Sequence, residues 1–182
     1  SIILVHYNET KTTNACVASV ARLTHPGFRL QCLIVDNGSV KPYILPKELR
    51  NSKKFSVIRS DANLGFTGGN NLGIHHAVEH NNSQYIFLLN NDTTIHKNAL
   101  EHLLQHAEAN PQVGIINPKI YFSPGKEFHH DSYHVSDRGS VLWFAGGTVD
   151  WRHLTATHRG VDEVDRGHFD QVCDSDFATG CA

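Results

Sequence analysis

The most constraining stretch of this sequence is a short apolar run that stops abruptly on polar residues. Residues 85–89 read Tyr-Ile-Phe-Leu-Leu, and Asn90, Asn91 and Asp92 follow directly. Five apolar residues are too few for a membrane span and are typical of a strand buried in a parallel sheet. Ligands of open α/β sheets bind beyond the carboxyl ends of strands, so Asp92 is expected at a ligand crevice. A carboxylate there suits Mg²⁺ or Mn²⁺; the alternative is that Asp92 only caps the next helix.

Similar segments along the chain predict strands that alternate with helices. Strands are predicted over residues 1–8, 30–35, 55–59 and 85–89, with short ones over 112–116 and 119–122. Helices are predicted over 9–23, 42–50 and 97–109, and a glycine-rich segment over 63–73 runs into another helix through 77–78. This alternation indicates the α/β class, with a Rossmann-like, mostly parallel central sheet covered by helices on both faces.

The length of 182 residues suits a single domain over residues 1–182. The strand–helix alternation occupies residues 1–122. From residue 123 onward the chain is rich in Ser, Gly, His and Asp, with one strand-like island over 141–149. We expect loops and irregular hairpins there, laid over the sheet. The region has too few apolar residues for a core of its own, which favours one domain over a boundary near residue 123.

Four polar clusters fall at the predicted carboxyl ends of successive strands. They occupy residues 7–8, 36–39, 63–71 and 90–92. Each has an ordinary explanation as a turn, because Asp-Asn-Gly-Ser and Asn-Leu-Gly are common turn sequences. Parallel strands end along one edge of a sheet, however, so all four clusters are expected to converge there.

The glycine-rich cluster could hold a diphosphate, since glycines let backbone N–H groups approach an anion before a helix N-terminus. Gly65, Gly68 and Gly69 do not have the G-x-G-x-x-G spacing of a dinucleotide site, and no Gly-Lys-Ser/Thr of a P-loop is present. No Gly-x-Ser-x-Gly elbow supports a hydrolase. Hydride transfer, nucleoside-triphosphate hydrolysis and α/β-hydrolase chemistry are therefore disfavoured.

Composition sets further bounds. The net charge of −2 gives no electrostatic case for nucleic acid as a partner. The four cysteines lack C-x-x-C spacing, which favours reduced thiols in a cytoplasmic protein. No run reaches transmembrane length, and no signal peptide opens the sequence. With no methionine and an end at Ala182 inside what reads as an ordered element, the sequence is expected to be a fragment.

A histidine-rich cluster and two tryptophans in the second half of the chain can each be interpreted in two ways. His129, His130, Asp131 and His134 could bind a metal, but an exposed loop is the better interpretation. Trp143 and Trp151 could stack on a sugar ring or pack over the sheet.

As a set, these motifs resemble the family 2 glycosyltransferases, particularly their rhamnosyltransferase-like members. The resemblance rests on three motifs and on the terminal Asp-Phe-Ala-Thr-Gly-Cys-Ala. The motifs are Val-Asp-Asn-Gly-Ser over 35–39, Asn-x-Gly-Phe-x-x-Gly-Asn-Asn-x-Gly over 63–73, and Leu-Leu-Asn-Asn-Asp over 88–92. It implies a GT-A fold, with residues 1–122 as the donor-binding half and 123–182 as the start of an acceptor-side region.

The resemblance also implies roles for individual residues. Tyr7 and Asp36 would hold the base and ribose side of a nucleotide-diphosphate sugar, and Asn63, Gly69 and Asn70 would line the nucleotide and diphosphate. The other implied donor-side positions are Asn8, Asn37, Ser39, Gly65 and Asn91.

Asp92 would be the aspartate that binds a divalent cation, Mg²⁺ or Mn²⁺, with Asn90 standing where the family's first acidic residue lies. In the family the general base lies in a Glu-Asp segment, which we expect beyond Ala182, so no catalytic residue is assigned.

The function implied is an inverting transfer of a sugar, from a dTDP- or UDP-sugar such as an activated rhamnose, to a glycan or lipid-linked acceptor in polysaccharide biosynthesis. The expected location is cytoplasmic, at the inner face of the membrane, with residues beyond Ala182 as a candidate for peripheral membrane association. Two alternatives stay open: a catalytically silent nucleotide-sugar-binding module, and a sugar nucleotidyltransferase. The second is disfavoured because residues 8–12 lack the glycine-rich signature of that class.

Overall fold

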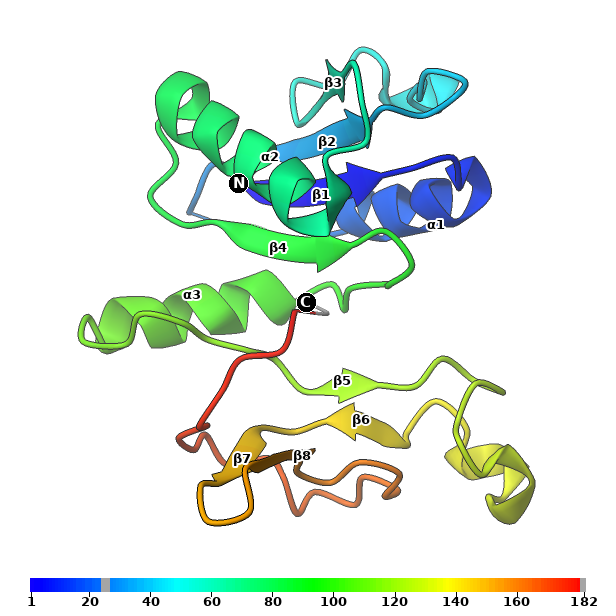
Figure 1. The fold of residues 1–182 in the computed structure, drawn as a ribbon, viewed down its shortest axis with the longest axis vertical. Helices are drawn as coiled ribbons and strands as arrows, with labels where there is room; N and C mark the ends of the chain where they lie inside the picture. Colours follow the sequence, from blue (N-terminus) through cyan, green and yellow to red (C-terminus); the bar gives the residue numbers. More distant parts are fainter. Residues whose placement is uncertain (24–26, 181–182) are drawn as a thin grey trace. The chain divides into compact units, whose positions relative to one another are not determined.

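Four parallel strands form the sheet that the alternation predicts. The computed structural model describes residues 1–23 and 27–180, and its central strands are β1 (Ile2–His6), β2 (Cys32–Asn37), β3 (Phe55–Ser60) and β4 (Phe87–Asn90). Their order is β3-β2-β1-β4, and every pair is parallel (Figure 1). The mostly parallel central sheet expected from the sequence is thereby confirmed.

The register of this sheet brings the strand tips together. His6 of β1 is paired with Asp36 of β2, and Asp36 is paired with Arg59 of β3. On the other side of β1, Val5 is paired with Asn90 of β4. Three of the four polar clusters therefore begin at one edge of the sheet, as parallel pairing requires.

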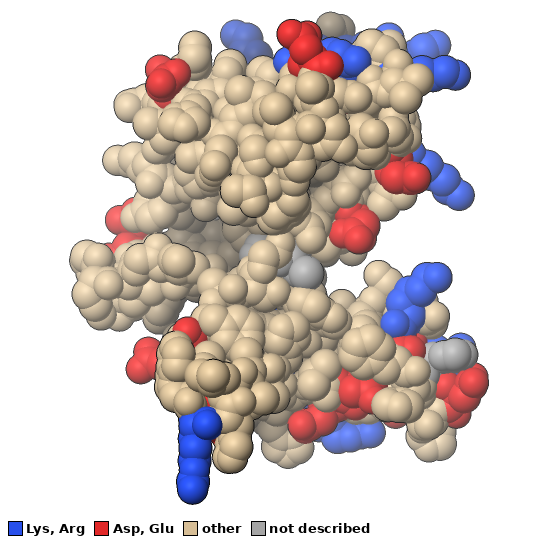
Figure 2. Space-filling view, in the orientation of Figure 1, with Lys and Arg blue, Asp and Glu red and all other residues tan. Residues whose placement is uncertain are grey.

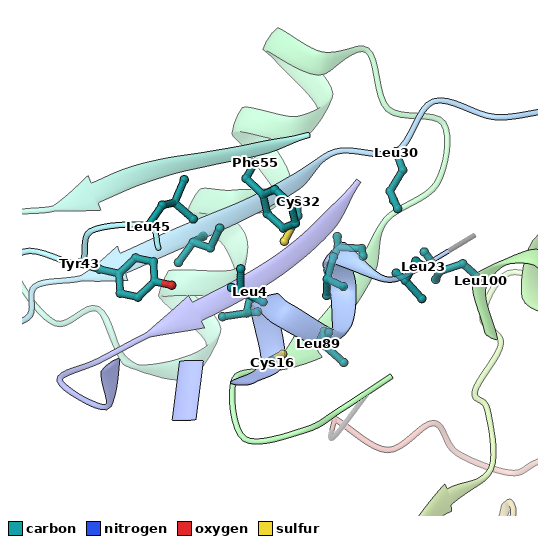
Figure 3. Packing of buried hydrophobic residues seen from close by; sticks show 14 residues of the cluster. Leu4, Cys16, Leu23, Leu30, Cys32, Tyr43, Leu45, Phe55, Leu89 and Leu100 are labelled. Atoms are coloured by element: carbon teal, nitrogen blue, oxygen red, sulfur yellow. The ribbon is translucent and has the colours of Figure 1, made fainter. Parts of the chain in front are cut away.

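Helices cover both faces of the sheet, as predicted. Helix α1 (Thr10–Ala21) buries Cys16, Val17 and Val20 against one face, in a cluster with strand residues such as Leu4 and Ile34. Figure 3 shows this cluster, in which Tyr43, Leu45 and Phe55 also take part. Helix α2 (Gly65–Asn81) covers the other face, where Ala77 packs with Ile3, Leu33 and Val35.

The structure corrects several predicted elements. Most of the glycine-rich segment 63–73 is itself helical, because α2 begins at Gly65, earlier than the predicted helix through 77–78. Of the expected helix over 42–50, only the 3₁₀ turn Lys47–Leu49 is helical. Residues 112–116 form no strand. Strand β4 is less buried than predicted, since it lies at an edge of the described sheet and only Leu89 among its residues is buried.

Contacts divide the described residues into two compact units, Ser1–His106 and Ala107–Gly180. The predicted boundary between 122 and 123 lies inside the second unit, and the single-domain organisation stays a prediction. Helix α3 (Ala99–Ala109) agrees with the predicted helix over 97–109 and buries Leu100.

The second unit is built from short strands in two antiparallel pairs. The pairs are β5 (Ile120–Tyr121) with β6 (Leu142–Phe144), and β7 (Gly147–Asp150) with β8 (Thr155–His158). Two 3₁₀ turns, His130–Ser132 and Val135–Asp137, lie in the connection between β5 and β6. The island predicted over 141–149 is thus two strands, β6 and β7.

Contacts of several side chains in the second unit bear on the histidine-rich cluster and the two tryptophans without deciding the metal alternative. Trp143 packs edge-on against His158, with ring centroids 4.5 Å apart, whereas Trp151 is exposed. His129 pairs with Asp162, and no group of three metal-binding side chains occurs among the described residues.

The structure also bears on the cysteines, on membrane-spanning helices and on the charged surface. Cys16, Cys32 and Cys173 are free thiols, the first two buried, while Cys181 lies outside the described residues. No helix within residues 1–23 and 27–180 combines the length and apolar character needed to span a bilayer. On the viewed face of the first unit, acidic and basic side chains both occur around the periphery (Figure 2). That nucleic acid is not a partner stays a prediction.

Candidate functional site

A hollow of about 320 Å³ lies at the carboxyl edge of the sheet in the first unit. Its volume falls in the range of small-molecule pockets. The lining comes from β1, β2, β4 and the start of α2, namely Val5, Tyr7, Asn37, Asn63, Gly65, Phe66, Asn70, Leu89, Asn90, Asn91 and Asp92. The convergence predicted from the four polar clusters is therefore present.

Asn37 fixes the wall formed by the start of α2. Its buried side-chain Nδ2 donates to Asn63 Oδ1 and to the carbonyl of Gly65, both at 3.0 Å. Its Oδ1 accepts the N–H of Leu64, also at 3.0 Å. The side chain thus joins the tip of β2 to the loop after β3, and its hydrogen-bonding capacity is nearly used within the protein.

Helix α2 begins directly at the hollow. Asn63 Oδ1 accepts the N–H of Gly65 at 2.8 Å, and Gly65 has a positive φ of 72°, a conformation that favours glycine. Asn70 lies one turn further along and donates from Nδ2 to the carbonyl of Phe66. The first N–H groups of a helix have no partners within it and carry a partial positive charge, so this end of α2 is suited to an anion.

The side chain of Asp36 is engaged by neighbouring groups of the protein. Its side chain is buried and does not line the hollow. Oδ1 accepts the N–H of Ser39, and Oδ2 accepts the N–H of Tyr43 and pairs with Arg59. Burial alone would raise the pKa of Asp36, but hydrogen bonds from Ser39, Tyr43 and Arg59 outweigh it and hold the pKa below its ordinary value.

The loop after β2 is tied to the loop after β1. The N–H of Asn8 donates to Ser39 Oγ at 3.0 Å, and the N–H of Val40 donates to Asn8 Oδ1 at 2.9 Å. Asn8 has a positive φ of 62°, which asparagine tolerates better than most residues. These bonds position Tyr7, whose exposed ring lines the hollow.

The tip of β4 supplies the groups that could hold a cation. Asp92 is exposed at the hollow, and it is the only carboxylate among the described residues that line it. The backbone carbonyl oxygen of Asn90 is already used: it accepts a hydrogen bond from Thr93 Oγ1 at 2.7 Å and lies 3.5 Å from Cys16 Sγ. One carboxylate with a neighbouring side-chain amide fits Mg²⁺ or Mn²⁺ when water and phosphate oxygens complete the coordination. These two protein groups are too few to complete the coordination of the cation by themselves.

Of the residues predicted for the site, eight line the hollow and four do not. Those at the hollow are Tyr7, Asn37, Asn63, Gly65, Asn70, Asn90, Asn91 and Asp92. Asn8, Asp36, Ser39 and Gly69 do not line it, and they contact its surroundings through the hydrogen bonds described above and, for Gly69, through packing against Val5. Their roles toward a ligand stay predictions.

Three lining residues were not predicted for the site: Val5, Phe66 and Leu89. Val5 and Leu89 each come shortly before the carboxyl end of a strand, so their positions in the sequence could have predicted that they line the hollow. Phe66 follows Gly65 inside the glycine-rich motif, and its exposed ring lies at the first turn of α2.

Comparison with known proteins identifies the family. The sequence profile of Glycosyl transferase family 2 matches residues 1–165. A poly-β-1,6-N-acetyl-D-glucosamine synthase of Staphylococcus epidermidis is 27% identical over 122 residues, which are 66% of this chain and 28% of that protein. The low-salt glycan biosynthesis hexosyltransferase Agl10 of Haloferax volcanii is 28% identical over 124 residues, 66% of this chain and 36% of that one. The chain thus spans about a third of the length of these relatives.

Solved structures show the same fold. The structure of S. aureus TarS 1–349 in complex with UDP-GlcNAc matches 60% of this chain and 31% of its own, with a TM-score of 0.51 and 19% identity. Another S. aureus TarS structure matches 69% of this chain and 24% of its own, with a TM-score of 0.50 and 16% identity. Together with the profile match over residues 1–165, the hollow at the strand tips and the parallel sheet lead to one conclusion: this chain belongs to glycosyl transferase family 2.

Proposed function

We propose that this chain forms the donor-binding part of an inverting glycosyltransferase. The enzyme would move a sugar from a nucleotide-diphosphate donor to a glycan or lipid-linked acceptor in the biosynthesis of a polysaccharide. The observation that carries the proposal is the hollow, where polar strand tips and the N-terminus of α2 meet in a member of glycosyl transferase family 2.

Each wall of the hollow suits one part of such a donor. The exposed ring of Tyr7 offers a surface on which a base can stack. Asn37 and Asn63 hold the start of α2 in place, and the N–H groups of the first turn that follow Gly65 suit the diphosphate. In an inverting displacement the acceptor hydroxyl attacks the anomeric carbon while the bond to the diphosphate breaks. These N–H groups would then stabilise the charge that develops on the leaving group.

Asp92, with Asn90 beside it, would hold a divalent cation together with the diphosphate. Such a cation supplies further charge stabilisation at the leaving group. Among the described residues that line the hollow, no second carboxylate is available to take the acceptor proton. The general base therefore has no assignment within the hollow.

The first donor to test is a UDP-sugar, because the S. aureus TarS structure that shares this fold is a complex with UDP-GlcNAc. A dTDP-sugar such as dTDP-rhamnose is the second, on the basis of the resemblance to rhamnosyltransferase-like sequences. We place the reaction in the cytoplasm at the inner face of the membrane, which is compatible with the free thiols Cys16, Cys32 and Cys173.

The test is titration calorimetry of the chain with UDP, dTDP and GDP, each with and without MnCl₂. We expect one nucleotide to bind with a Kd in the micromolar to millimolar range, more tightly when Mn²⁺ is present. Asp92→Asn keeps the size of the side chain and removes its charge, so it should abolish the effect of Mn²⁺ and leave metal-free binding unchanged.

Glu79→Gln is the matched control, since it removes an exposed carboxylate from α2 away from the hollow. This variant should bind as the wild type does. If none of the three nucleotides binds in either condition, the donor-site proposal is wrong.

A further inference from the structure

Three buried side chains of α1 contact the segment that carries Asp92. Thr13, Cys16 and Ser19 are three residues apart, so they lie in a row on one side of the helix. All three are at most 1% exposed. We call them the polar row of α1, and none of them lines the hollow.

Each member of the row has a separate contact with residues 90–95. Thr13 Oγ1 accepts a hydrogen bond from Asn91 Nδ2 at 3.0 Å. Cys16 Sγ lies 3.5 Å from the carbonyl oxygen of Asn90. Ser19 Oγ accepts the backbone N–H of Ile95 at 3.2 Å and donates to the carbonyl of Cys16 at 2.7 Å.

Thr13, at one end of the row, is itself held in place. Thr13 Oγ1 shares a hydrogen bond of 2.7 Å with Nδ1 of His6, which is fully buried at the tip of β1. Burial lowers the pKa of His6, so the ring is neutral near pH 7 and adds no charge beside Thr13. Burial also raises the pKa of Cys16 to about 12, so its thiol keeps the hydrogen that it offers to Asn90.

The contacts have a common result at the hollow. Asn90, Asn91 and Asp92 all line it, and Asp92 stands next to the side chain that Thr13 holds. Residues 91–98 form no helix or strand, so regular secondary structure does not fix their positions. Hydrogen bonds from α1 hold them, together with the turn bonds of Thr93 to Asn90 and the packing of Ile95 against the core.

We propose that the polar row of α1, supported by His6, positions the segment 90–95 and so places Asp92 and Asn90 toward a bound nucleotide and cation. Thr13, Cys16 and Ser19 are positioning residues here, since they act through Asn90, Asn91 and Ile95. The consequence for a ligand rests on the proposed function, whereas the consequence for the segment itself does not.

The first experiment measures backbone hydrogen exchange by NMR in the nucleotide-free chain. Ser19→Ala removes the acceptor of the Ile95 N–H, so this amide should exchange about tenfold faster. Thr13→Val keeps the shape of the buried side chain without its hydroxyl and should loosen Thr93, whose N–H donates to the Asn90 carbonyl. Amides in β1 and β2, such as those of Leu4 and Ile34, should keep their protection.

Two further variants separate positioning from general stability. Thr13→Ser keeps the hydroxyl and should restore the protection of residues 91–95. Thr12→Val makes the same chemical change one residue earlier, outside the polar row, and should leave these amides unchanged. If Ser19→Ala and Thr13→Val both keep wild-type protection at Thr93 and Ile95, the proposal is overturned.

The second experiment measures the Kd of UDP by calorimetry with and without MnCl₂. Thr13→Val should weaken binding in Mn²⁺ at least about fivefold and leave metal-free binding unchanged, while Thr13→Ser should bind as the wild type. Equal binding by Thr13→Val and the wild type would refute the link to the ligand. A wild type that binds no nucleotide would refute the donor-site proposal alone, because hydrogen exchange decides the positioning of the segment independently.

Discussion

The side chain of Asn37 donates to Asn63 at 3.0 Å, and this bond ties the tip of β2 to the loop that leads into α2. Three of the hydrogen bonds that define the wall of the hollow depend on Asn37. Because its side chain is 2% exposed, water cannot replace these partners without a change in structure.

Asn37→Asp tests this arrangement with almost no change in shape. The carboxylate still accepts the Leu64 N–H, but it faces Asn63 Oδ1 and the Gly65 carbonyl without a hydrogen to donate. We expect the free energy of unfolding at pH 7 to fall by about 2–4 kcal/mol, because a buried charge replaces two hydrogen bonds. Urea denaturation measures this. Asn71→Asp, at an exposed position of α2, should change it by less than about 0.5 kcal/mol.

The Asp36–Arg59 pair predicts a dependence of stability on pH. The folded-state pKa of Asp36 is below its ordinary value of 3.8, so the carboxylate binds a proton more readily in the unfolded chain. Its contribution is therefore complete above about pH 4 and is lost as the pH falls through the folded-state pKa. Asp36→Asn should lower the free energy of unfolding at pH 7 by about 1–3 kcal/mol and reduce the slope of stability against pH between 4 and 2.

Urea denaturation at several pH values measures that slope, and Asp61→Asn is the control because Asp61 is exposed. An unchanged slope in Asp36→Asn would contradict the internal role of Asp36. Arg59→Met should act in the same direction as Asp36→Asn, with a smaller effect because the arginine side chain is 38% exposed.

The central sheet and its polar edge were predictable because short apolar runs ending in polar residues leave few other folds. The pairing of His6 with Asp36 and of Val5 with Asn90 follows once the strands are parallel. The early start of α2 was not predictable from local preference, since Gly65, Gly68 and Gly69 are poor helix formers. Packing overrides that preference, because Gly69 and Gly73 lie against Val5 and Ile3 where larger side chains do not fit.

The internal role of Asp36 was hidden for a different reason. A polar residue at a strand tip has the same sequence signature whether its side chain contacts a ligand or a neighbouring loop. Arg59 lies 23 residues further along the chain, and only the parallel register of β2 and β3 places it beside Asp36. Burial of Asp36 and the partners of its two oxygens are tertiary facts that no local pattern contains.

Gly69 provides a test of the close packing between α2 and β1. A Cβ at this position would lie 2.9 Å from Cγ1 of Val5 and 3.3 Å from Nδ2 of Asn37. Alanine is favoured over glycine inside a helix by about 1 kcal/mol, yet we expect Gly69→Ala to lower the free energy of unfolding by about 1–3 kcal/mol. Calorimetric melting measures the change.

The double variant Gly69→Ala/Val5→Ala gives the matching control, because it removes the Val5 methyl groups that the new Cβ would meet. Its stability should exceed the value expected from adding the two single effects by about 1 kcal/mol or more. Purely additive effects would show that the contact between Gly69 and Val5 does not restrict the helix.

In the second unit, Lys119 should control the ionisation of Asp165. Lys119 Nζ lies 2.6 Å from Asp165 Oδ2 and 2.5 Å from Asp170 Oδ1, and the hydroxyl of Tyr121 donates to Asp165 Oδ2 at 2.6 Å. The hydrogen bond from Lys119 is the main cause that lowers the pKa of Asp165 to about 2, and Tyr121 adds to it. Lys119→Met keeps much of the apolar stem and should return this pKa toward 3.8, as a ¹³C NMR titration of the carboxyl group would show.

The same variant should also change the stability of the protein, and the direction of the change follows from the difference between the folded-state and unfolded-state pKa of Asp165. Because the pKa of Asp165 is lowered on folding, its pairing stabilises the protein above about pH 4 and stops doing so as the pH falls through about 2. Lys119→Met should therefore lower the free energy of unfolding by about 1–2 kcal/mol at pH 6, and the difference from the wild type should shrink toward pH 2.

Lys126→Met removes an exposed lysine of the same unit and should leave both the Asp165 titration and the stability unchanged. A wild-type pKa for Asp165 in Lys119→Met would mean that Tyr121 and the backbone N–H of Gly167, which also bonds Asp165, are sufficient to hold the carboxylate.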